Sequence, residues 1–169
     1  MKKSTKIVIL SIAVLFIATV CLWLLNSSNI NREGGGVIIV ITENGETIAE
    51  VDLEYIRSFD SETFKTVIRS SSNKPEDVEY TGVLLKSLIE GKEISLDDKT
   101  RLIVKGLDGY MTAISIEEFE KKDIYLAYEM NKKPIKPREQ NGYGPFQLVI
   151  PGDPFSQRWC KFVCEVEIK

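Results

Sequence analysis

Residues 125–162 read YLAYEMNKKPIKPREQNGYGPFQLVIPGDPFSQRWCKF, and this stretch decides the fold. Two apolar runs, at residues 124–130 and 146–150, are typical of buried strands. The turn residues Asn131 and Pro134 end the first run, and Pro151 and Gly152 end the second. A loop that carries Gly and Pro joins the two runs. The stretch therefore predicts paired strands rather than a helical bundle.

The same patterns continue on the N-terminal side of this stretch. The turn signals Asn44-Gly45 and Asp108-Gly109 each separate two alternating runs, which indicates two hairpins. Further strands are expected at 64–69, 101–105 and 161–168. Short helices are expected at 53–59, at 84–89 and from Ile116, where Ser115 is a suitable cap, and a polar loop is expected at 70–79. Because strands dominate without regular alternation with helices, we predict a mixed-sheet α+β domain.

The N-terminal 30 residues form a separate segment. Three lysines, at positions 2, 3 and 6, precede an uncharged run from Ile7 to Leu25. A helix of this length would span roughly 28 Å, close to the hydrocarbon thickness of a bilayer. The lysines predict a cytoplasmic N-terminus, with the remainder of the chain outside a cell membrane that is crossed once. The predicted organisation is an anchor at 1–30, the end of a polar, glycine-rich spacer at 31–36, and a domain at 37–169.

Two alternatives to an uncleaved anchor remain. A cleaved signal peptide would have a shorter apolar region and small residues at the cleavage site, whereas this run ends in Leu22-Trp23-Leu24-Leu25. A lipoprotein would use Cys21, but Val20 before it is a poor substitute for the small residue expected there. We therefore expect residues 7–25 to stay attached as the membrane partner of the chain.

Composition excludes several classes of protein. The chain carries a formal charge of −3, and residues 31–169 hold 19 of its 22 basic and all 25 of its acidic residues, a charge of −6. Such a domain lacks the basic stripe of a nucleic-acid-binding protein. Histidine is absent, which removes the commonest metal ligand and rules out Ser-His-Asp and Cys-His catalysis by this chain alone.

The cysteines offer little chemistry. Cys21 lies in the apolar run, and Cys160 and Cys164 lie four residues apart in a segment that alternates like a strand. Two residues at that spacing in a strand are about 13 Å apart, too far for a disulfide. We therefore expect no disulfide between them.

The stretch at 125–162 resembles the C-terminal part of the sulfite oxidase-type molybdopterin-binding oxidoreductase family. That family has a Tyr-Glu-Met-Asn-Gly-x-Pro-Leu motif, a Gly-x-Pro loop, a strand closing in Pro-Gly, and Arg-x-x-Lys before a last strand. A Gly-Val-x-Leu-x-x-Leu-Leu segment leading into a helix is similar to residues 82–89 here. The matching residues are Tyr128, Glu129, Met130, Asn131, Pro134, Gly144, Pro145, Pro151, Gly152, Arg158 and Lys161. The resemblance implies a sulfite oxidase-type fold and molybdopterin as cofactor, or otherwise no cofactor.

One residue that the resemblance requires is missing. In the family, a cysteine thiolate after the strand before the Gly-Val-x-Leu helix binds molybdenum, a soft ligand suited to that metal. Here the corresponding positions are Ser70, Ser71, Ser72 and Asn73, and no cysteine lies between Cys21 and Cys160. We therefore expect no protein ligand to a metal and assign no catalytic residue.

The resemblance assigns cofactor-binding roles to Ser70, Ser71, Gly144, Arg158 and Lys161. Any retained ligand is expected to be anionic and to touch Arg158 or Lys161 beside the loop at 142–145. The plainer alternative is that the two cations are solvated charges that flank a strand, and that residues 70–73 form a polar surface loop. Lys132 replaces a glycine of the family pattern, which would cost about 1 kcal/mol if the position has a positive φ.

Three functions fit these observations. The first is a membrane-anchored, extracytoplasmic domain that acts as a non-catalytic ligand-binding or accessory module. The second is an active molybdopterin-dependent oxidoreductase with a non-cysteine metal site in the serine loop. The third is a structural domain that binds only a protein partner, whose identity the sequence does not give. Fold alone does not decide among them when the site is altered.

Overall fold

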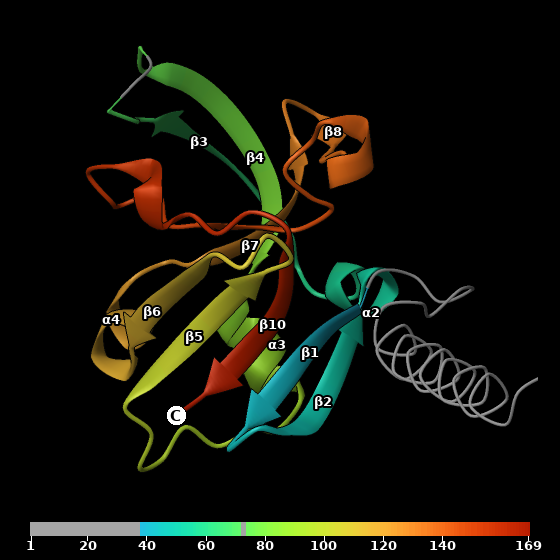
Figure 1. Ribbon diagram of the computed structural model, residues 1–169, viewed down its shortest axis with the longest axis vertical. Helices are drawn as coiled ribbons and strands as arrows, with labels where there is room; N and C mark the ends of the chain where they lie inside the picture. Colours follow the sequence, from blue (N-terminus) through green and yellow to red (C-terminus); the bar gives the residue numbers. More distant parts are fainter. Residues whose placement is uncertain (1–37, 72–73) are drawn as a thin grey trace, which may run out of the picture. The chain divides into compact units, whose positions relative to one another are not determined.

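The structure, a computed structural model, describes residues 38–71 and 74–169 and contains two five-stranded sheets, A and B (Figure 1). Residues 36–169 form one compact unit. The anchor predicted at residues 7–25 and the spacer after it lie outside the described residues. Within the described part of the chain, no helix has the length and hydropathy needed to cross a membrane.

Sheet A is mixed, and the last strand of the chain lies at its centre. Its strands are β1 (Ile38–Glu43), β2 (Glu46–Asp52), β5 (Arg101–Gly106), β6 (Met111–Ser115) and β10 (Val163–Ile168). The order is β2-β1-β10-β5-β6, with β10 parallel to β1 and antiparallel to β5. The hairpins predicted at Asn44-Gly45 and Asp108-Gly109 are β1–β2 and β5–β6.

Sheet B is antiparallel throughout. It consists of β3 (Glu62–Ile68), β4 (Glu76–Leu84), β7 (Tyr125–Met130), β8 (Lys133–Pro134) and β9 (Gln147–Val149). The order is β3-β4-β7-β8, and β9 pairs with the first half of β7. The two apolar runs that decided the sequence interpretation are therefore neighbouring strands, β7 and β9.

Short helices connect the strands. They are α2 (Leu53–Arg57), α3 (Leu85–Gly91), α4 (Ile116–Lys121) and the 3₁₀ turns η1 (Arg138–Gln140) and η2 (Ser156–Arg158). The predicted cap at Ser115 is confirmed, because its hydroxyl accepts a hydrogen bond from the Glu118 backbone N–H at 3.1 Å. Asp52 caps α2 in the same way, accepting from the Tyr55 N–H at 2.7 Å.

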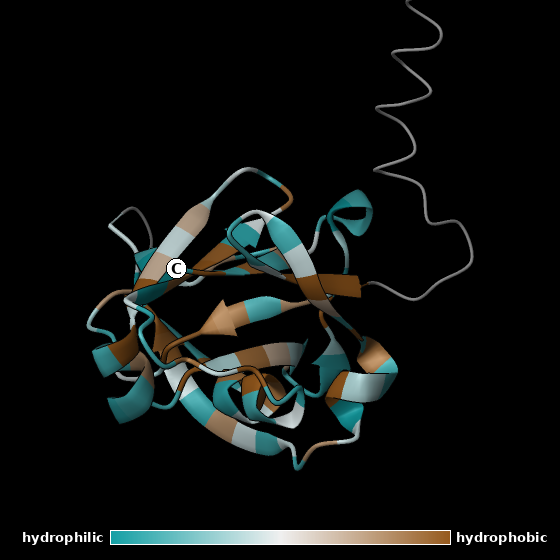
Figure 2. Ribbon diagram, turned by 90° about the horizontal axis from the view of Figure 1, so that it is seen from below, coloured by the Kyte–Doolittle hydropathy of each residue, from teal (hydrophilic) through white to brown (hydrophobic). Residues whose placement is uncertain are grey.

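One hydrophobic core joins both sheets and α3. It takes Ile39 and Ile41 from β1, Leu102 and Val104 from β5, and Leu85, Leu88 and Ile89 from α3. Residues 146–150 are all buried, including the polar Gln147. Hydrophobic residues concentrate in the strands, and the connecting loops are largely hydrophilic (Figure 2). The predicted mixed-sheet α+β architecture is therefore confirmed.

Three local expectations were wrong. The predicted loop at 70–79 ends early, because β4 already begins at Glu76. The last strand begins at Val163 rather than Lys161, because Phe162 has a φ of +54° and interrupts the extended chain. Cys160 and Cys164 are both free, as expected. The expected strand through both residues is wrong, however, because Cys160 lies before the start of β10, so the spacing of residues along a strand does not explain why they form no disulfide.

Lys132 lies where the family pattern has glycine, and its backbone shows the conformation that glycine favours. Asn131 and Lys132 have φ values of +52° and +63° and form the two-residue turn between β7 and β8. A positive φ at both positions is the geometry of the hairpin turn that fits strand twist, and Asn tolerates it better than Lys. The turn therefore forms in this chain with an unfavourable backbone conformation at Lys132.

Gly82 allows β4 and β7 to approach closely, and this generates the first prediction. A Cβ at this position would lie 2.6 Å from the Leu126 carbonyl oxygen and 2.7 Å from the Ala127 Cα. We expect Gly82→Ala to lower the free energy of unfolding by about 1–3 kcal/mol, because backbone atoms cannot yield as a side chain would. Urea denaturation followed by circular dichroism measures the change.

Gly152→Ala is the matched control for that experiment. A Cβ there meets no atom within 4 Å, so its effect should stay within about 0.5 kcal/mol. Equal stabilities of the two variants would show that the β4–β7 contact is not the constraint described.

Candidate functional site

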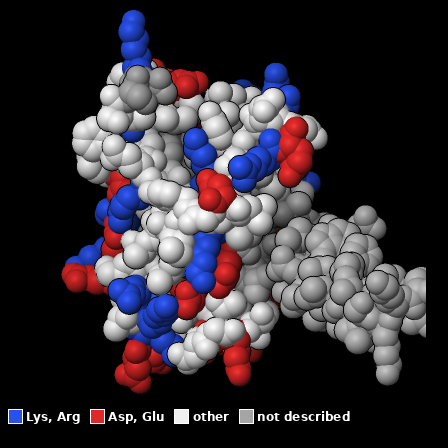
Figure 3. Space-filling model, in the orientation of Figure 1, with Lys and Arg blue, Asp and Glu red and all other residues white. Residues whose placement is uncertain are grey.

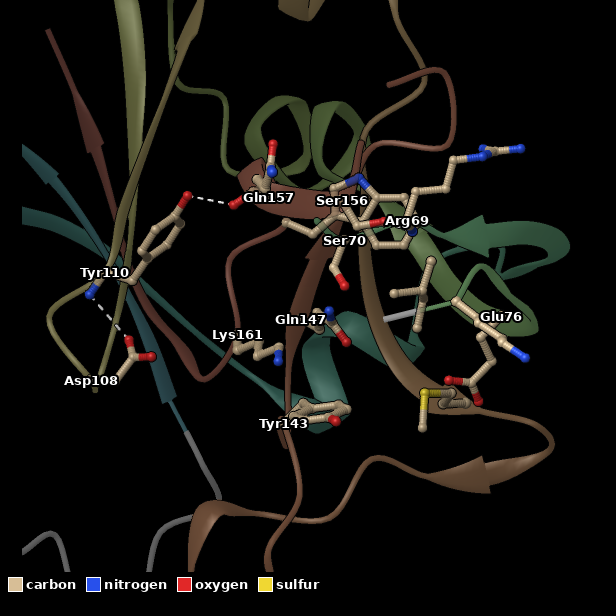
Figure 4. A pocket seen from close by; sticks show the side chains of 14 residues that line it. Arg69, Ser70, Glu76, Asp108, Tyr110, Tyr143, Gln147, Ser156, Gln157 and Lys161 are labelled. Carbon is tan, nitrogen blue, oxygen red and sulfur yellow. Dashed lines mark hydrogen bonds between the residues drawn. The ribbon is translucent and has the colours of Figure 1, made fainter. Parts of the chain in front are cut away.

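A cavity of about 460 Å³ lies where the ends of several strands meet the loops. Ile68, Arg69 and Ser70 reach it from the end of β3, and Lys74 and Glu76 from the start of β4. Asp108 and Tyr110 come from the β5–β6 turn. The remaining lining residues are Met130, Tyr143, Gln147, Ser156, Gln157, Trp159 and Lys161. Figure 4 shows how these side chains surround the space.

Hydrogen bonds fix the η2 segment as one wall of the cavity. The Arg69 N–H donates to the Ser156 hydroxyl at 2.8 Å, and the Ser156 N–H donates to the Arg69 carbonyl at 3.0 Å. From the other side, the Tyr110 hydroxyl donates to the Gln157 carbonyl. These bonds tie η2 to both sheets, so the cavity wall does not depend on a free loop.

The polar side chains inside the cavity are held in place by neighbours. The Lys161 ammonium lies 3.8 Å from the centre of the Tyr143 ring, where the negative face of the aromatic ring attracts the positive charge. The Gln147 side-chain oxygen accepts a hydrogen bond from the buried Tyr80 hydroxyl at 3.2 Å. In Figure 4, Lys161 and the Ser70 hydroxyl point into the cavity, whereas the Arg69 side chain extends away from it.

Charged residues of both signs line the cavity. Lys74 and Lys161 lie there with two acids, Glu76 and Asp108, and Arg69 also lines it although its side chain extends away. The Asp108 carboxylate accepts a hydrogen bond from the Tyr110 N–H at 3.1 Å, which fixes the side chain beside its own turn. On the surface face shown in Figure 3, acidic and basic side chains are also interspersed. Within the cavity, Lys161 is the cation that points into the space and could pair with an anion.

Two of the five cofactor-binding residues assigned from the family resemblance, Ser70 and Lys161, line this cavity. Ser71 and Gly144 are outside the lining, although Gly144 directly follows the lining residue Tyr143. Gly144 has no room for a side chain, since a Cβ would lie 2.7 Å from the Ile135 side chain. The structure therefore brings Ser70 and Lys161 to one space and gives Gly144 a packing role.

Arg158, the fifth assigned residue, is outside the cavity lining and pairs with two carboxylates. Its guanidinium binds both oxygens of Glu118, at 3.1 and 2.6 Å, and both oxygens of Asp153, at 3.0 and 2.8 Å. The Asp153 side chain is only 3% exposed, and Lys122 also contacts both carboxylates. The two bidentate contacts use four of the five guanidinium N–H groups, so Arg158 acts in the structure as a clamp between α4 and η2.

Sequence reasoning missed most of the cavity, and one signal in the sequence was available. Gln147 is a polar residue inside an otherwise apolar strand, and such a residue needs a buried partner or a cavity. Arg69, Ser156 and Gln157 carry no comparable signal, because only the tertiary fold brings η2 against the end of β3.

The cavity does not include a thiol. Cys160 lies between two lining residues, but its sulfur is buried and faces the Lys161 and Tyr110 carbonyls at 3.5 and 3.9 Å. Burial raises the pKa of this thiol to about 12, which keeps it protonated near neutral pH. Among residues 38–71 and 74–169, no group of three or more Cys, Asp or Glu side chains is arranged to hold a metal ion.

The Arg158 clamp predicts a specific dependence of stability on pH. Hydrogen bonds from Arg158 lower the pKa of the Glu118 carboxyl to about 2, against about 4.3 in an unfolded chain. A lowered carboxyl pKa stabilises the fold above about pH 4.3, and this contribution is lost as the pH falls toward 2. Glu118→Gln should remove on the order of 2 kcal/mol of that pH-dependent stability, measured by urea denaturation between pH 2 and 7.

Glu117→Gln serves as the control for this titration. Glu117 pairs with Lys121 on the exposed face of α4, where both side chains are largely exposed. We expect this variant to keep the acid-dependent loss of stability, because exposed pairs contribute little. A Glu118→Gln domain with an unchanged acid profile would contradict the clamp.

Comparisons with known proteins agree with this architecture. A family model described as "Oxidoreductase molybdopterin binding domain" matches residues 37–169. The sulfane dehydrogenase SoxCD from Paracoccus pantotrophus superposes with a TM-score of 0.65 at 18% sequence identity, covering 78% of this chain. The match spans 37% of the SoxCD chain, and at this identity it supports the fold alone.

No curated protein matched the sequence. The family model nevertheless covers both sheets and every residue that lines the cavity. The resemblance recognised in the sequence motifs is confirmed by this match. The chain therefore belongs to the oxidoreductase molybdopterin-binding domain family.

Proposed function

We propose that residues 37–169 bind an anionic, planar ligand of the pterin type without carrying out molybdenum-dependent oxidation. The observation that supports this proposal most is a cavity that keeps a centrally directed lysine, Lys161, but has no thiol in its lining. Its volume falls within the roughly 300–1,000 Å³ typical of small-molecule sites.

The organic part of a molybdopterin fits the residues present. Tyr110, Tyr143 and Trp159 offer aromatic surface to a flat heterocycle, and Gln147 and Gln157 offer amide groups. Lys161 supplies the charge for a phosphate or carboxylate group of the ligand.

The metal part does not fit. Molybdenum in this family is bound by a cysteine thiolate, and the corresponding region here has serines. A serine hydroxyl stays protonated near neutral pH unless a base activates it, and the chain has no histidine to do so. The buried thiol of Cys160 faces carbonyl groups and is outside the cavity lining.

The proposal also includes attachment to a membrane. The uncharged run at residues 7–25 and the lysines before it support a single anchor, with the domain on the extracytoplasmic side. In this arrangement the domain is an accessory module that presents or senses an anionic ligand at the cell surface.

A second candidate is an active oxidoreductase in which a serine oxygen replaces the thiolate. One observation favours it: Ser70 lines the cavity, and its hydroxyl points inward. Stoichiometric molybdenum in protein purified from its own host, with turnover abolished by Ser70→Ala or Ser71→Ala, would establish this candidate and refute the first. Our proposal predicts little molybdenum by elemental analysis and no sulfite oxidation.

Ligand binding itself is tested with pterin-6-carboxylate, a fluorescent anionic pterin. We expect Lys161→Gln to weaken its binding about 10- to 100-fold, because a hydrogen bond to a charged group contributes about 1.5–3 kcal/mol. Fluorescence titration of the purified protein measures the dissociation constants.

Lys121→Gln is the control, because this substitution removes one positive charge from α4, at a position outside the cavity. It should leave the affinity unchanged. Binding that is absent in the parent protein, or equally weakened in both variants, would count against a pterin site at Lys161.

A further inference from the structure

The end of sheet A at which β1 begins also carries the β5–β6 turn. β1 and β10 are parallel, so Ile38 and Val163 lie at the same end of the sheet. β5 runs the opposite way, and its last residue, Gly106, pairs with Val163. The turn that follows β5 is therefore about two strand spacings, roughly 10 Å, from the point where the chain enters the domain.

This end of the sheet exposes an apolar surface. Leu107 and Met111 are 64% and 61% exposed, and Tyr110 and Tyr143 are 43% and 38% exposed. These four residues, called the apolar rim below, are most of the six large hydrophobic side chains exposed in the described part of the chain. Isolated exposed hydrophobic residues need no explanation, but a cluster indicates a binding surface.

Backbone hydrogen bonds fix the segments that carry the rim relative to one another. The Leu107 N–H donates to the Phe162 carbonyl at 3.0 Å, and the Phe162 N–H donates to the Tyr143 carbonyl at 2.7 Å. The Gly106 N–H donates to the Tyr110 carbonyl at 2.9 Å. Three segments that are distant in the sequence therefore present their side chains from one fixed scaffold.

Basic side chains accompany the rim. Lys161 lies over the Tyr143 ring, and the Arg138 guanidinium lies 5.9 Å from the centre of the Phe162 ring. The one acid in the turn, Asp108, is hydrogen-bonded back to the Tyr110 N–H. Aromatic and aliphatic residues flanked by Lys and Arg are the composition of surfaces that lie in the interfacial layer of a membrane.

We infer that the apolar rim docks on the lipid bilayer to which the chain is anchored. The inference rests on the proposed anchor at residues 7–25, and 12 residues lie between Leu25 and Ile38. A random-coil chain of 12 residues spans about 20 Å on average, so such an anchor would leave the rim within reach of the headgroup layer. Tyr110 and Tyr143 also line the cavity, so docking brings one cavity wall to the lipid surface.

Tryptophan quenching by brominated lipid tests the inference in the full chain. The chain carries Trp23→Phe and is reconstituted in phosphatidylcholine vesicles with a minor fraction of phosphatidylglycerol. Two variants are compared, Leu107→Trp on the rim and Ile48→Trp on β2. Ile48 is 42% exposed and lies beside the Asn44-Gly45 turn, at the opposite end of sheet A.

We expect brominated lipid to quench most of the added emission of Leu107→Trp and none of that of Ile48→Trp. The remaining Trp159 is 4% exposed and contributes the same background to both. Equal quenching of the two variants, or none in either, would overturn the inference and leave the rim facing water or another protein.

A second experiment distinguishes an error in the proposed docking surface from an error in the proposed membrane anchor. Residues 37–169 contain the whole described core, so this part can be attached through an N-terminal histidine tag to nickel-chelating lipids. Quenching of Leu107→Trp here, with no vesicle association of the full chain, would refute the anchor but keep the docking surface. Absence of quenching on tethered protein would refute docking alone.

Discussion

The segment from Trp159 to Val163 connects the two sheets, and the remaining structure depends on its hydrogen bonds. Its Cys160 carbonyl accepts from the Leu148 N–H at 2.8 Å, and its Val163 N–H donates to the Phe146 carbonyl at 3.0 Å, which ties it to sheet B. The Leu107 N–H ties it to sheet A through Phe162, and the Trp159 indole donates to the Ile150 carbonyl at 3.1 Å. Because the backbone of this segment is fixed on both sides, Trp159 and Lys161 are held at the cavity without support from a ligand. The constraint that closes the core thus also builds the site.

In the proposed function, ligand binding and redox chemistry depend on different parts of the site. The proposed affinity for a flat anion depends on surfaces from several elements: the tyrosines, the amides of Gln147 and Gln157, and Lys161. Redox chemistry in the family depends on one soft ligand, and the family resemblance aligns its position with the serines at 70–72. In the proposed function, loss of that thiolate would remove the redox chemistry and leave the cavity in place. Arg158, which the family resemblance assigns to the cofactor, binds Glu118 and Asp153 in this structure.

Much of the fold could be predicted from local pattern. The buried strands at Tyr125–Met130 and Gln147–Val149 are nearly all apolar, and the two hairpins carry strong turn signals. β4 was missed in the prediction, because the exposed residues Glu76 and Asp77 at its start were read as part of a loop and the residues around Gly82 as the approach to a helix. The role of Arg158 was beyond prediction, since its partners lie 40 and 5 residues away and only the packing of α4 on η2 brings them together. Lys161 could be placed at the site through its motif, but its orientation depends on Tyr143.

The central position of β10 has a consequence for how the protein is made. A ribosome delivers β1 near the beginning of the domain and β10 last, yet these two strands are neighbours in sheet A. Until β10 has been made, one edge of β1 and one edge of β5 have no partner from their own chain. Open strand edges are sites at which nascent chains pair with one another. The domain therefore passes through a vulnerable interval during translation, and β10 closes it.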